Sequence, residues 1–358
     1  MTRQKGGHRG EGSGEIRGLA GPKAEKPVSL ALQGGGAHGA FTWGVLDALI
    51  EDGRLAFEAI SGASAGAMNA VVMAEGWAEG GPDGARSALE TFWRHVSLDG
   101  GLCEAERNVF DQILNSWSPS GSPFGAWLNI WSSSLSPYDT NPFDLNPLRD
   151  VLVQLVDFDR LRAADVKLFV SATNVWTGKI RIFERAELQP DHVMASTCLP
   201  TVFKAVEIEG EPYWDGGYMG NPALFPLFYG VGTSDVLLVQ INPIERRETP
   251  RQVQEIHNRL NEITFNGGLL RELRQIEFVT RLLDEGKLST TDYKRVLMHR
   301  LNGGAKIDAF TAATRSKAEL GFFLELRDLG RATAKEWLAK NYKAIGKHAT
   351  LDLKAAYS

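Results

Sequence analysis

The segment from Leu30 to Ile50, LALQGGGAHGAFTWGVLDALI, limits the fold more than any other part of the chain. It opens as a short apolar run typical of a buried strand, breaks at three consecutive glycines, and continues with apolar residues at helical spacing. A buried strand that leads through a glycine turn into an amphipathic helix is typical of an α/β protein. The turn itself could hold a phosphate, a dinucleotide or the negative charge of a reaction intermediate.

The same alternation of strands and helices continues along the chain. Apolar runs predict strands at 28–33, 57–62, 166–173, 180–184 and 236–241. Together they predict an α/β domain over 27–245 with a mainly parallel sheet covered by helices. From 246 to 358 the chain is charged and helical in pattern, which predicts a helical C-terminal extension. One of its helices is expected to begin with a capping box at Ser316 and Glu319 and to end at Gly330.

Two segments depart from this pattern. Residues 1–26 are rich in glycine and carry six basic against three acidic side chains, which predicts a disordered tail. A weak membrane-surface arm and an uncleaved export signal are alternative roles for this tail. Residues 100–147 form an insertion or lid whose aromatic stretch, 117–143, either packs onto the domain or makes peripheral contact with a membrane interface. The aromatic residues are Trp117, Phe124, Trp127, Trp131, Tyr138 and Phe143.

The overall composition excludes several classes of protein. The net charge of −5 leaves no basic surface for nucleic acid. No apolar run approaches the roughly 18 residues that a membrane-spanning helix needs, and the N-terminus has no apolar core of a cleavable signal peptide. These features predict a cytoplasmic or peripheral membrane protein, and they leave its oligomeric state open.

The glycine turn matches the dinucleotide-binding pattern G-x-G-x-x-G at Gly34, Gly36 and Gly39. That interpretation needs an acidic residue at the end of the second strand to bind the ribose. The sequence there is SGASAG, and Glu58 lies at the beginning of the strand instead. A P-loop is excluded because no Gly-Lys-Ser/Thr follows the turn.

Two further motifs offer the groups of a serine hydrolase. GASAG, residues 62–66, places Ser64 between a strand and a helix, where a sharp turn exposes a serine as a nucleophile. Asp215 begins the turn DGG and follows FKAVEIEGEPYW, which predicts a two-stranded unit. Taken singly, each motif also fits a purely structural turn.

In this order and spacing, the glycine turn, the G-x-S-x-G motif and the distant D-G-G turn resemble the patatin-like phospholipase family. The resemblance runs from Ser29 to Asn242 and includes the segment ASTCLPTVFKAVEIEGEPYWDGG. It implies a three-layer α/β/α fold, to which the pattern of residues 246–358 adds the C-terminal helical extension. It also implies hydrolysis of lipid acyl esters by a Ser64–Asp215 dyad, without a metal ion or other cofactor.

The resemblance assigns roles to the residues around the dyad. Gly34, Gly35, Gly36, Ala37, His38 and Gly39 would form the oxyanion hole, with the amides of Gly35 and Gly36 as the expected donors. Gly62, Ala63, Ala65 and Gly66 would shape the nucleophile turn, and Gly216 and Gly217 the aspartate turn. His38 stands where the family usually has Arg or Lys. It either titrates beside the oxyanion site or points outward from the helix start.

Two other functions remain open on the sequence. In a true α/β-hydrolase a histidine after Asp215 would complete a triad. His257, His299 and His348 are available, but all three are expected in the charged helical region, away from an active site. The chain could also be an inactive lipid-binding or scaffold protein, which the presence of both Ser64 and Asp215 disfavours. The identity of the acyl substrate is not determined by the sequence.

Overall fold

The computed structural model describes residues 17–97, 136–141, 144–304, 306–307 and 320–357. Its strands are β1 (Leu19–Ala20), β2 (Lys26–Leu32), β3 (Leu55–Gly62), β4 (Lys167–Asn174), β5 (Ile180–Glu184), β6 (Val206–Ile208), β7 (Glu211–Asp215), β8 (Asp235–Gln240) and β9 (Leu297–Asn302). They form one sheet in the order β6-β7-β4-β3-β2-β8-β9, with β1 beside β3 and β5 beside β4. The five strands expected from apolar runs are therefore confirmed.

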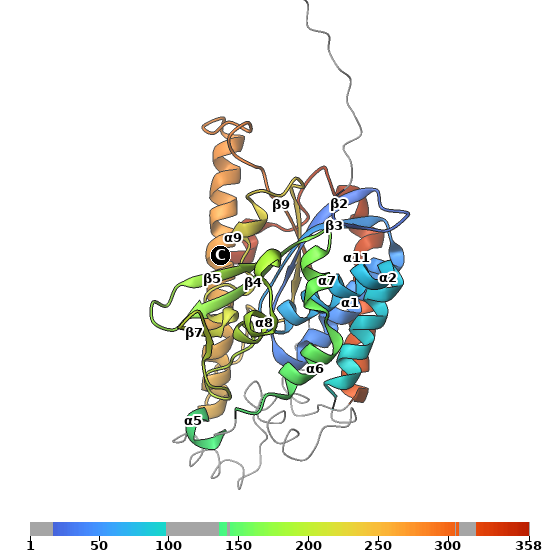
Figure 1. Ribbon diagram of the computed structural model, residues 1–358. Helices are drawn as coiled ribbons and strands as arrows, with labels where there is room; N and C mark the ends of the chain where they lie inside the picture. Colours follow the sequence, from blue (N-terminus) through green and yellow to red (C-terminus); the bar gives the residue numbers. More distant parts are fainter. Residues whose placement is uncertain (1–16, 98–135, 142–143, 305, 308–319, 358) are drawn as a thin grey trace, which may run out of the picture.

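Helices lie on both faces of this sheet (Figure 1). The α-helices are α1 (Gly39–Asp52), α2 (Ala65–His95), α5 (Pro137–Thr140), α6 (Pro147–Leu155), α7 (Phe158–Ala163), α8 (Pro190–Ser196), α9 (Val253–Asp284), α11 (Leu320–Asn341) and α12 (Leu353–Tyr357). Short 3-10 helices are η1 (Gly36–His38), η2 (Arg185–Glu187), η3 (Gly216–Tyr218), η4 (Phe225–Leu227) and η5 (Tyr342–Ala344). Each helix of the described ranges is too short or too polar to cross a membrane.

The centre of the sheet is parallel and its edge beyond β4 is antiparallel. Strands β4, β3, β2, β8 and β9 run in one direction, so their carboxyl ends share one edge of the sheet. β6 and β7 pair antiparallel, which confirms the expected two-stranded unit, and β7 and β5 both run antiparallel to β4. Ser64 follows β3 and Asp215 ends β7, so the topology brings two segments that are distant in sequence to the same region.

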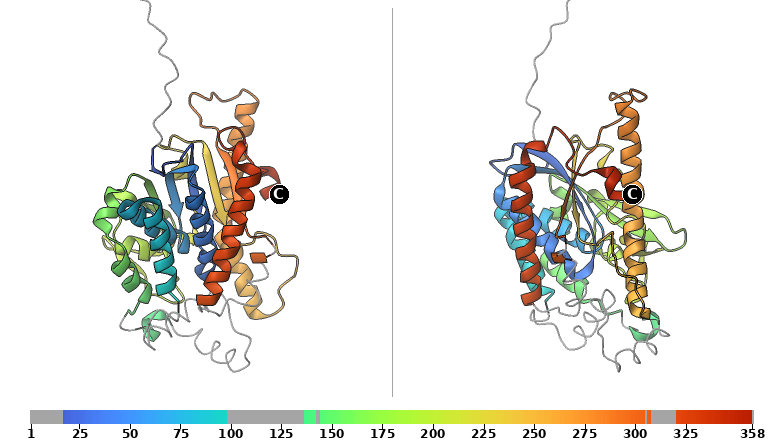
Figure 2. Two further views of the ribbon diagram at one scale, coloured as in Figure 1. Left: turned by 90° about the vertical axis from the view of Figure 1, so that its right-hand side faces the viewer. Right: turned by 180° about the vertical axis from the view of Figure 1, so that it is seen from behind.

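Both faces of the sheet are buried, which explains why its central strands are apolar throughout. Leu30 and Leu32 of β2 pack into a core beneath α1, α2 and α11, whereas Ala31 points into a second core. Leu269 and Leu273, one helical turn apart on α9, close that second core. Figure 2 shows α1, α2 and α11 on one face and α9 on the other. This is the three-layer arrangement that the family resemblance implies.

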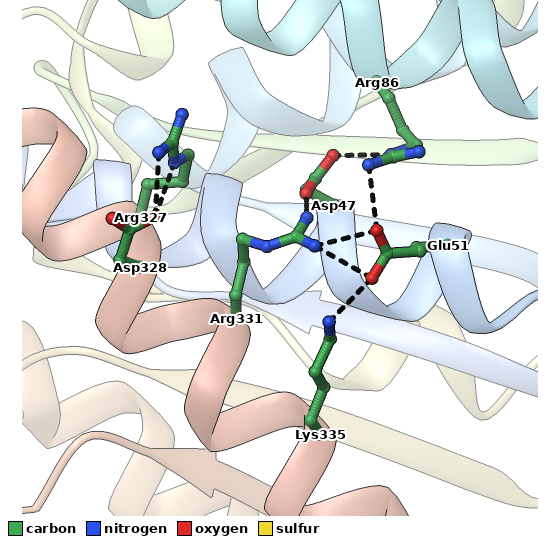
Figure 3. Close-up of polar contacts among 7 residues, drawn as sticks. All are labelled: Asp47, Glu51, Arg86, Arg327, Asp328, Arg331 and Lys335. Carbon is green, nitrogen blue, oxygen red and sulfur yellow. Dashed lines mark hydrogen bonds and ion pairs between the residues drawn. The ribbon is translucent and has the colours of Figure 1, made fainter.

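Helix α11 is held against α1 by a cluster of ion pairs at the surface of the helical layer (Figure 3). Glu51 of α1 binds Arg331 and Lys335 of α11, each at 2.8 Å. Asp47 of α1 binds Arg331 as well, and it binds Arg86 of α2 at 2.7 Å. Surface pairs of this kind contribute little free energy singly, but a shared network sets how the helices are aligned.

Gly330 does not end a helix, so the sequence expectation at this position was wrong. Helix α11 continues to Asn341, and Gly330 lies against α1 instead. A Cβ at Gly330 would lie 2.2 Å from the carbonyl oxygen of Phe41, and one at Gly44 would lie 1.9 Å from that of Arg327. The two glycines allow the backbones of α1 and α11 to approach closely, which the sequence pattern of a single helix does not reveal.

We expect Gly330→Ala to lower the free energy of unfolding by about 1–3 kcal/mol, because the new methyl group forces the two helices apart. The matched control is Gly267→Ala, also inside a helix, where the nearest atom to an added Cβ is 3.6 Å away. That control should raise stability by about 0.5–1 kcal/mol, the usual gain when a helix glycine becomes alanine. Urea unfolding followed by circular dichroism measures both. Equal effects of the two substitutions would disprove the close-packing explanation.

Two expectations about the ends of the chain need correction. The tail was expected to be disordered through residue 26, but Leu19 and Ala20 form β1, and Leu19 is buried against the sheet. The C-terminal extension is helical as expected in α9, α11 and α12, but it also contains Leu297–Asn302, which forms β9 and pairs with β8. An edge strand of mixed polarity such as LMHRLN has no clear apolar pattern, which is why it was missed. Most of the insertion 100–147 and of its aromatic stretch 117–143 lies outside the described residues.

Candidate active site

Ser64 occupies a sharp turn between β3 and α2. Its backbone has φ 52° and ψ −126°, a conformation that side-chain-bearing residues rarely adopt. A Cβ at Gly66 would lie 2.1 Å from the carbonyl oxygen of Leu32, and one at Gly62 would lie 2.7 Å from Gly66. The flanking glycines are therefore required by packing. The strained turn places the serine side chain beyond the end of the parallel strands, as the G-x-S-x-G pattern predicts.

Asp215 lies at the end of β7 and is completely buried. Its Oδ1 accepts a hydrogen bond from the amide of Gly217 at 2.7 Å, and its own amide donates to the carbonyl of Cys198 at 2.8 Å. Its Oδ2 is buried and has no hydrogen-bond partner of ordinary geometry among the described residues. A Cβ at Gly216 would lie 2.0 Å from the carbonyl oxygen of Ser171, so the turn needs glycine there. The turn thus presents one unsatisfied carboxylate oxygen.

Burial raises the pKa of Asp215 to about 7, because removing a carboxylate from water disfavours its charged form. The Gly217 amide and the Ser64 hydroxyl act in the opposite direction and lower this pKa. The Ser64 side chain therefore lies close enough to act on the Asp215 carboxyl. Ser64 itself is only 5% exposed. The structure brings together these two residues, which are far apart in the sequence.

The glycine turn lies directly beside the serine. A Cβ at Gly34 would lie 2.6 Å from the Cβ of Ser64, and one at Gly39 would lie 2.7 Å from the Cβ of Ala65. Gly36 has φ 56°, in the left-handed region that favours glycine. Beyond it, η1 leads into α1, so the turn ends at a helix start.

Three polar residues that the sequence reasoning did not select hold the glycine turn in place. Asn221 accepts a hydrogen bond from the Gly34 amide at 2.6 Å, and Asn242 donates to the Gly34 carbonyl, also at 2.6 Å. Gln33 accepts from the amides of Ile241 and Asn242. Their one sequence signal is the position of Gln33 and Asn242 just after apolar strands.

Ser196 is a fourth residue that the sequence did not single out. Its Oγ accepts a hydrogen bond from the Ser64 amide at 3.0 Å, and its side chain is fully buried at the end of α8. It lies in the segment ASTCLP, which entered the family resemblance only as a stretch of small residues. Ser196 therefore supports the backbone of the serine turn.

His38 is buried, so of the two alternatives the one in which it points outward is wrong. It lies at the end of η1 with its ring 6.3 Å from that of Phe322 in α11, in an edge-to-face arrangement. Phe322 lies 284 positions further along the chain, so its contact with His38 had no local sequence signal.

The histidines considered for a triad lie elsewhere. His299 was expected in a helical region, but it lies in β9 and is fully buried. Its Nε2 lies 2.9 Å from Oδ1 of Asp235, at the amino end of β8, and its Nδ1 lies 3.0 Å from Oγ1 of Thr350. This cluster lies toward the amino end of β8, whereas Ser64 lies beyond the carboxyl ends of the parallel strands. His348 is exposed beyond η5, and His257 belongs to α9.

The fold and these side chains define an α/β protein with a serine at a strand-to-helix turn and a buried carboxyl beside it. The family profile described as patatin-like phospholipase matches residues 30–228, more than half of the chain. The chain belongs to the patatin-like phospholipase family, as its motifs indicate, and this is a family of lipid acyl hydrolases.

Two solved structures are similar to this chain at low identity. One is VipD from Legionella pneumophila, with 17% identity, a TM-score of 0.37, and coverage of 88% of this chain and 70% of VipD. The other is the ExoU–SpcU complex of the type III secretion system of Pseudomonas aeruginosa. It has 18% identity, a TM-score of 0.31, and coverage of 76% of this chain and 61% of that chain. A search of curated proteins found no significant match.

Proposed function

We propose that this protein hydrolyses lipid acyl esters with Ser64 as the nucleophile and Asp215 as the base that activates it. The observation that carries the proposal is the buried Asp215 carboxyl beside Ser64, one oxygen of which makes no hydrogen bond of ordinary geometry with the described residues. A carboxylate in this environment is a stronger base than one in water, because protonation removes a poorly solvated charge.

In the proposed first step, the Ser64 hydroxyl gives its proton to Oδ2 of Asp215 while its oxygen attacks the carbonyl carbon of the ester. The tetrahedral intermediate then collapses, the bond to the alcohol breaks, and protonated Asp215 returns the proton to the leaving oxygen. Water then gives a proton to Asp215 and attacks the acyl-serine; the bond to the Ser64 oxygen breaks, Asp215 returns the proton to that oxygen, and the carboxylic acid is released. From the protein, each step needs only Ser64, Asp215 and backbone amides.

The amides of Gly35 and Gly36 are the proposed donors to the oxyanion. The Gly34 amide, which the family resemblance includes in the oxyanion hole, already donates to Asn221. Among the described residues, no backbone acceptor of ordinary geometry binds the amides of Gly35 and Gly36. Amides that are held in place and unsatisfied in the ground state are suited to stabilise a charge that develops later. Asn221 and Asn242, which fix Gly34, would keep them in position.

A Ser–Asp–His triad has less support. Both ring nitrogens of His299 are engaged by Asp235 and Thr350, and this cluster lies toward the opposite edge of the sheet from Ser64. The buried His299–Asp235 pair joins β9 to β8, which is a structural role.

The class of substrate can be tested with a panel of p-nitrophenyl esters of increasing chain length and with phospholipid vesicles. We expect the wild type to hydrolyse at least one long-chain ester or phospholipid and Ser64→Ala to hydrolyse none. Activity on short soluble esters alone would indicate an esterase. No activity of the folded wild type on any of them would favour the alternative of an inactive lipid-binding or scaffold protein.

A further inference from the structure

A cavity of about 690 Å³ lies at the carboxyl ends of β8 and β9, outside the group formed by Ser64, Asp215 and the glycine turn. Its walls come from these strand ends and the segments that follow them, from Arg259 of α9, and from residues 350–352 together with Ala355 and Ala356 of α12. Its volume lies within the range of small-molecule sites in proteins, about 300–1,000 Å³. The lining includes three arginines, Arg246, Arg259 and Arg300.

Of the three arginines that line the cavity, Arg300 has the least compensated charge. It projects from β9 and is half-buried, and no carboxylate of the described residues forms a salt bridge with it. Its contact is with a neutral group, the Oε1 of Gln240, at 3.5 Å, the outer limit of a hydrogen bond. Burial lowers the pKa of the guanidinium, since it has lost water without gaining a counter-charge. A guanidinium in this state favours an anion from outside the chain.

The other two arginines add to the positive field of the cavity. Arg246 and Arg259 share one carboxylate, that of Glu262, at 2.8 and 3.1 Å. Of the two acidic side chains that line the cavity, Glu245 binds Arg247 at 3.0 Å, and Asp352 accepts the amide of Ala355. The carboxylates are thus engaged by local donors, whereas Arg300 is not.

We propose that this cavity binds the oxyanion group of a small molecule, a phosphate or a carboxylate, with Arg300 as its principal contact. Guanidinium groups bind such oxyanions through two parallel N–H donors, which is the geometry that makes Arg the preferred residue for them. Apolar side chains of Ile244, Ile307 and Leu351 also line the cavity, so the ligand can carry a short apolar portion. This binding does not depend on the proposed hydrolysis.

The cavity is next to the glycine turn without being part of it. Gln240, which contacts Arg300, donates through Nε2 to the carbonyl oxygen of Asn242 at 3.0 Å. Asn242 in turn donates to the Gly34 carbonyl. Asn242 itself lines the cavity, so this residue separates the cavity from the candidate oxyanion turn.

The test is calorimetric titration of the full-length protein with inorganic phosphate, glycerol phosphate and octanoate in separate experiments. We expect the wild type to bind at least one of these, with a dissociation constant of about 1 mM or lower. Arg300→Gln should weaken this binding by about tenfold or more, the usual effect of losing one charged hydrogen-bond partner. Arg94→Gln is the matched control, because Arg94 is exposed on α2 and paired with Glu90.

A second variant protects the test against a folding defect of Arg300→Gln. Ala355→Trp, on the exposed α12, would fill the cavity from its rim and leave Arg300 unchanged. Loss of binding in both variants, or in Ala355→Trp alone if Arg300→Gln does not fold, supports the proposal. Binding of octanoate but not of phosphates assigns the site to carboxylates, and the reverse assigns it to phosphates. No binding by the wild type overturns the proposal. So does binding as tight as that of the wild type in Arg300→Gln, Ala355→Trp and the control Arg94→Gln.

Discussion

Replacement of Ser64 by alanine is expected to lower the turnover of an ester substrate by at least about 10³-fold while the protein remains folded. The reason is that no other group can form the acyl intermediate once the hydroxyl is removed. Asp215→Asn should cause a similar loss, because the amide keeps the shape of the side chain and the hydrogen bond from Gly217 but cannot take a proton. Steady-state kinetics with one soluble ester measures both effects, and thermal unfolding checks the fold.

The double variant tests whether the two residues act together. If Asp215 works only through Ser64, Ser64→Ala combined with Asp215→Asn should be little worse than either single variant. Losses that multiply would show that Asp215 has a separate role. His348→Ala is the control for a triad, because His348 is exposed and its loss should leave the fold intact. A folded His348→Ala or His257→Ala variant without turnover would contradict the dyad.

Turnover of a neutral ester is expected to rise with pH and to reach half of its plateau near pH 7. Asp215 must be ionised to accept the serine proton, and burial raises its pKa to about 7. Below this pKa the ionised fraction, and with it turnover, should fall about tenfold per pH unit. A pH–rate profile with the midpoint near pH 4, the ordinary value for Asp, would contradict this assignment.

Glu272 provides the control for this profile, because burial raises its pKa to about 7 as well. Its Oε2 accepts the amides of Leu224 and Phe225, so it anchors the chain that follows Asn221. Glu272→Gln keeps an acceptor for these amides and removes the titration. The pH–rate profile should remain in this variant if Asp215 is the titrating group. A profile that flattens in Glu272→Gln would transfer the pH dependence to the anchor of the loop.

The same pKa also affects stability, with a defined sign. In the folded protein Asp215 holds its proton up to about pH 7, whereas in the unfolded chain it loses the proton near the ordinary aspartate pKa of 3.8. The folded state therefore binds more protons in this window, and the contribution of Asp215 to the free energy of unfolding decreases as the pH rises from about 4 to 7. The Asp215→Asn variant should lack this part of the pH dependence.

The central strands and the two motif turns were predictable because their causes are local. A strand that is covered on both faces must be apolar throughout, as in β2 and β8, so its residues identify it without reference to neighbours. A turn that needs a positive φ or a close backbone approach must be built from small residues, as around Ser64 and Asp215. The order of these motifs was sufficient to indicate the family.

Features that depend on contacts between distant segments were not predictable in this way. Gly330 looks like a helix end in isolation and is in fact the site where α11 crosses α1. The edge strand β9 has no apolar periodicity, so its pairing with β8 could not be inferred from the sequence. For the same reason the positions of His299 and Arg300, which lie on β9, could not be inferred.

By itself, the sequence determined the α/β class and the glycine turn and indicated Ser64 and Asp215 as candidates, because each depends on the local backbone or on the chemistry of a side chain. Only the tertiary structure decided how these groups meet. The antiparallel pairing of β7 with β4 carries Asp215 to the serine turn, and burial there raises its pKa. Asn221 and Asn242 reach Gly34 from segments about 190 and 210 residues away, and a hydrogen bond between such distant positions leaves no trace in the pattern of either segment.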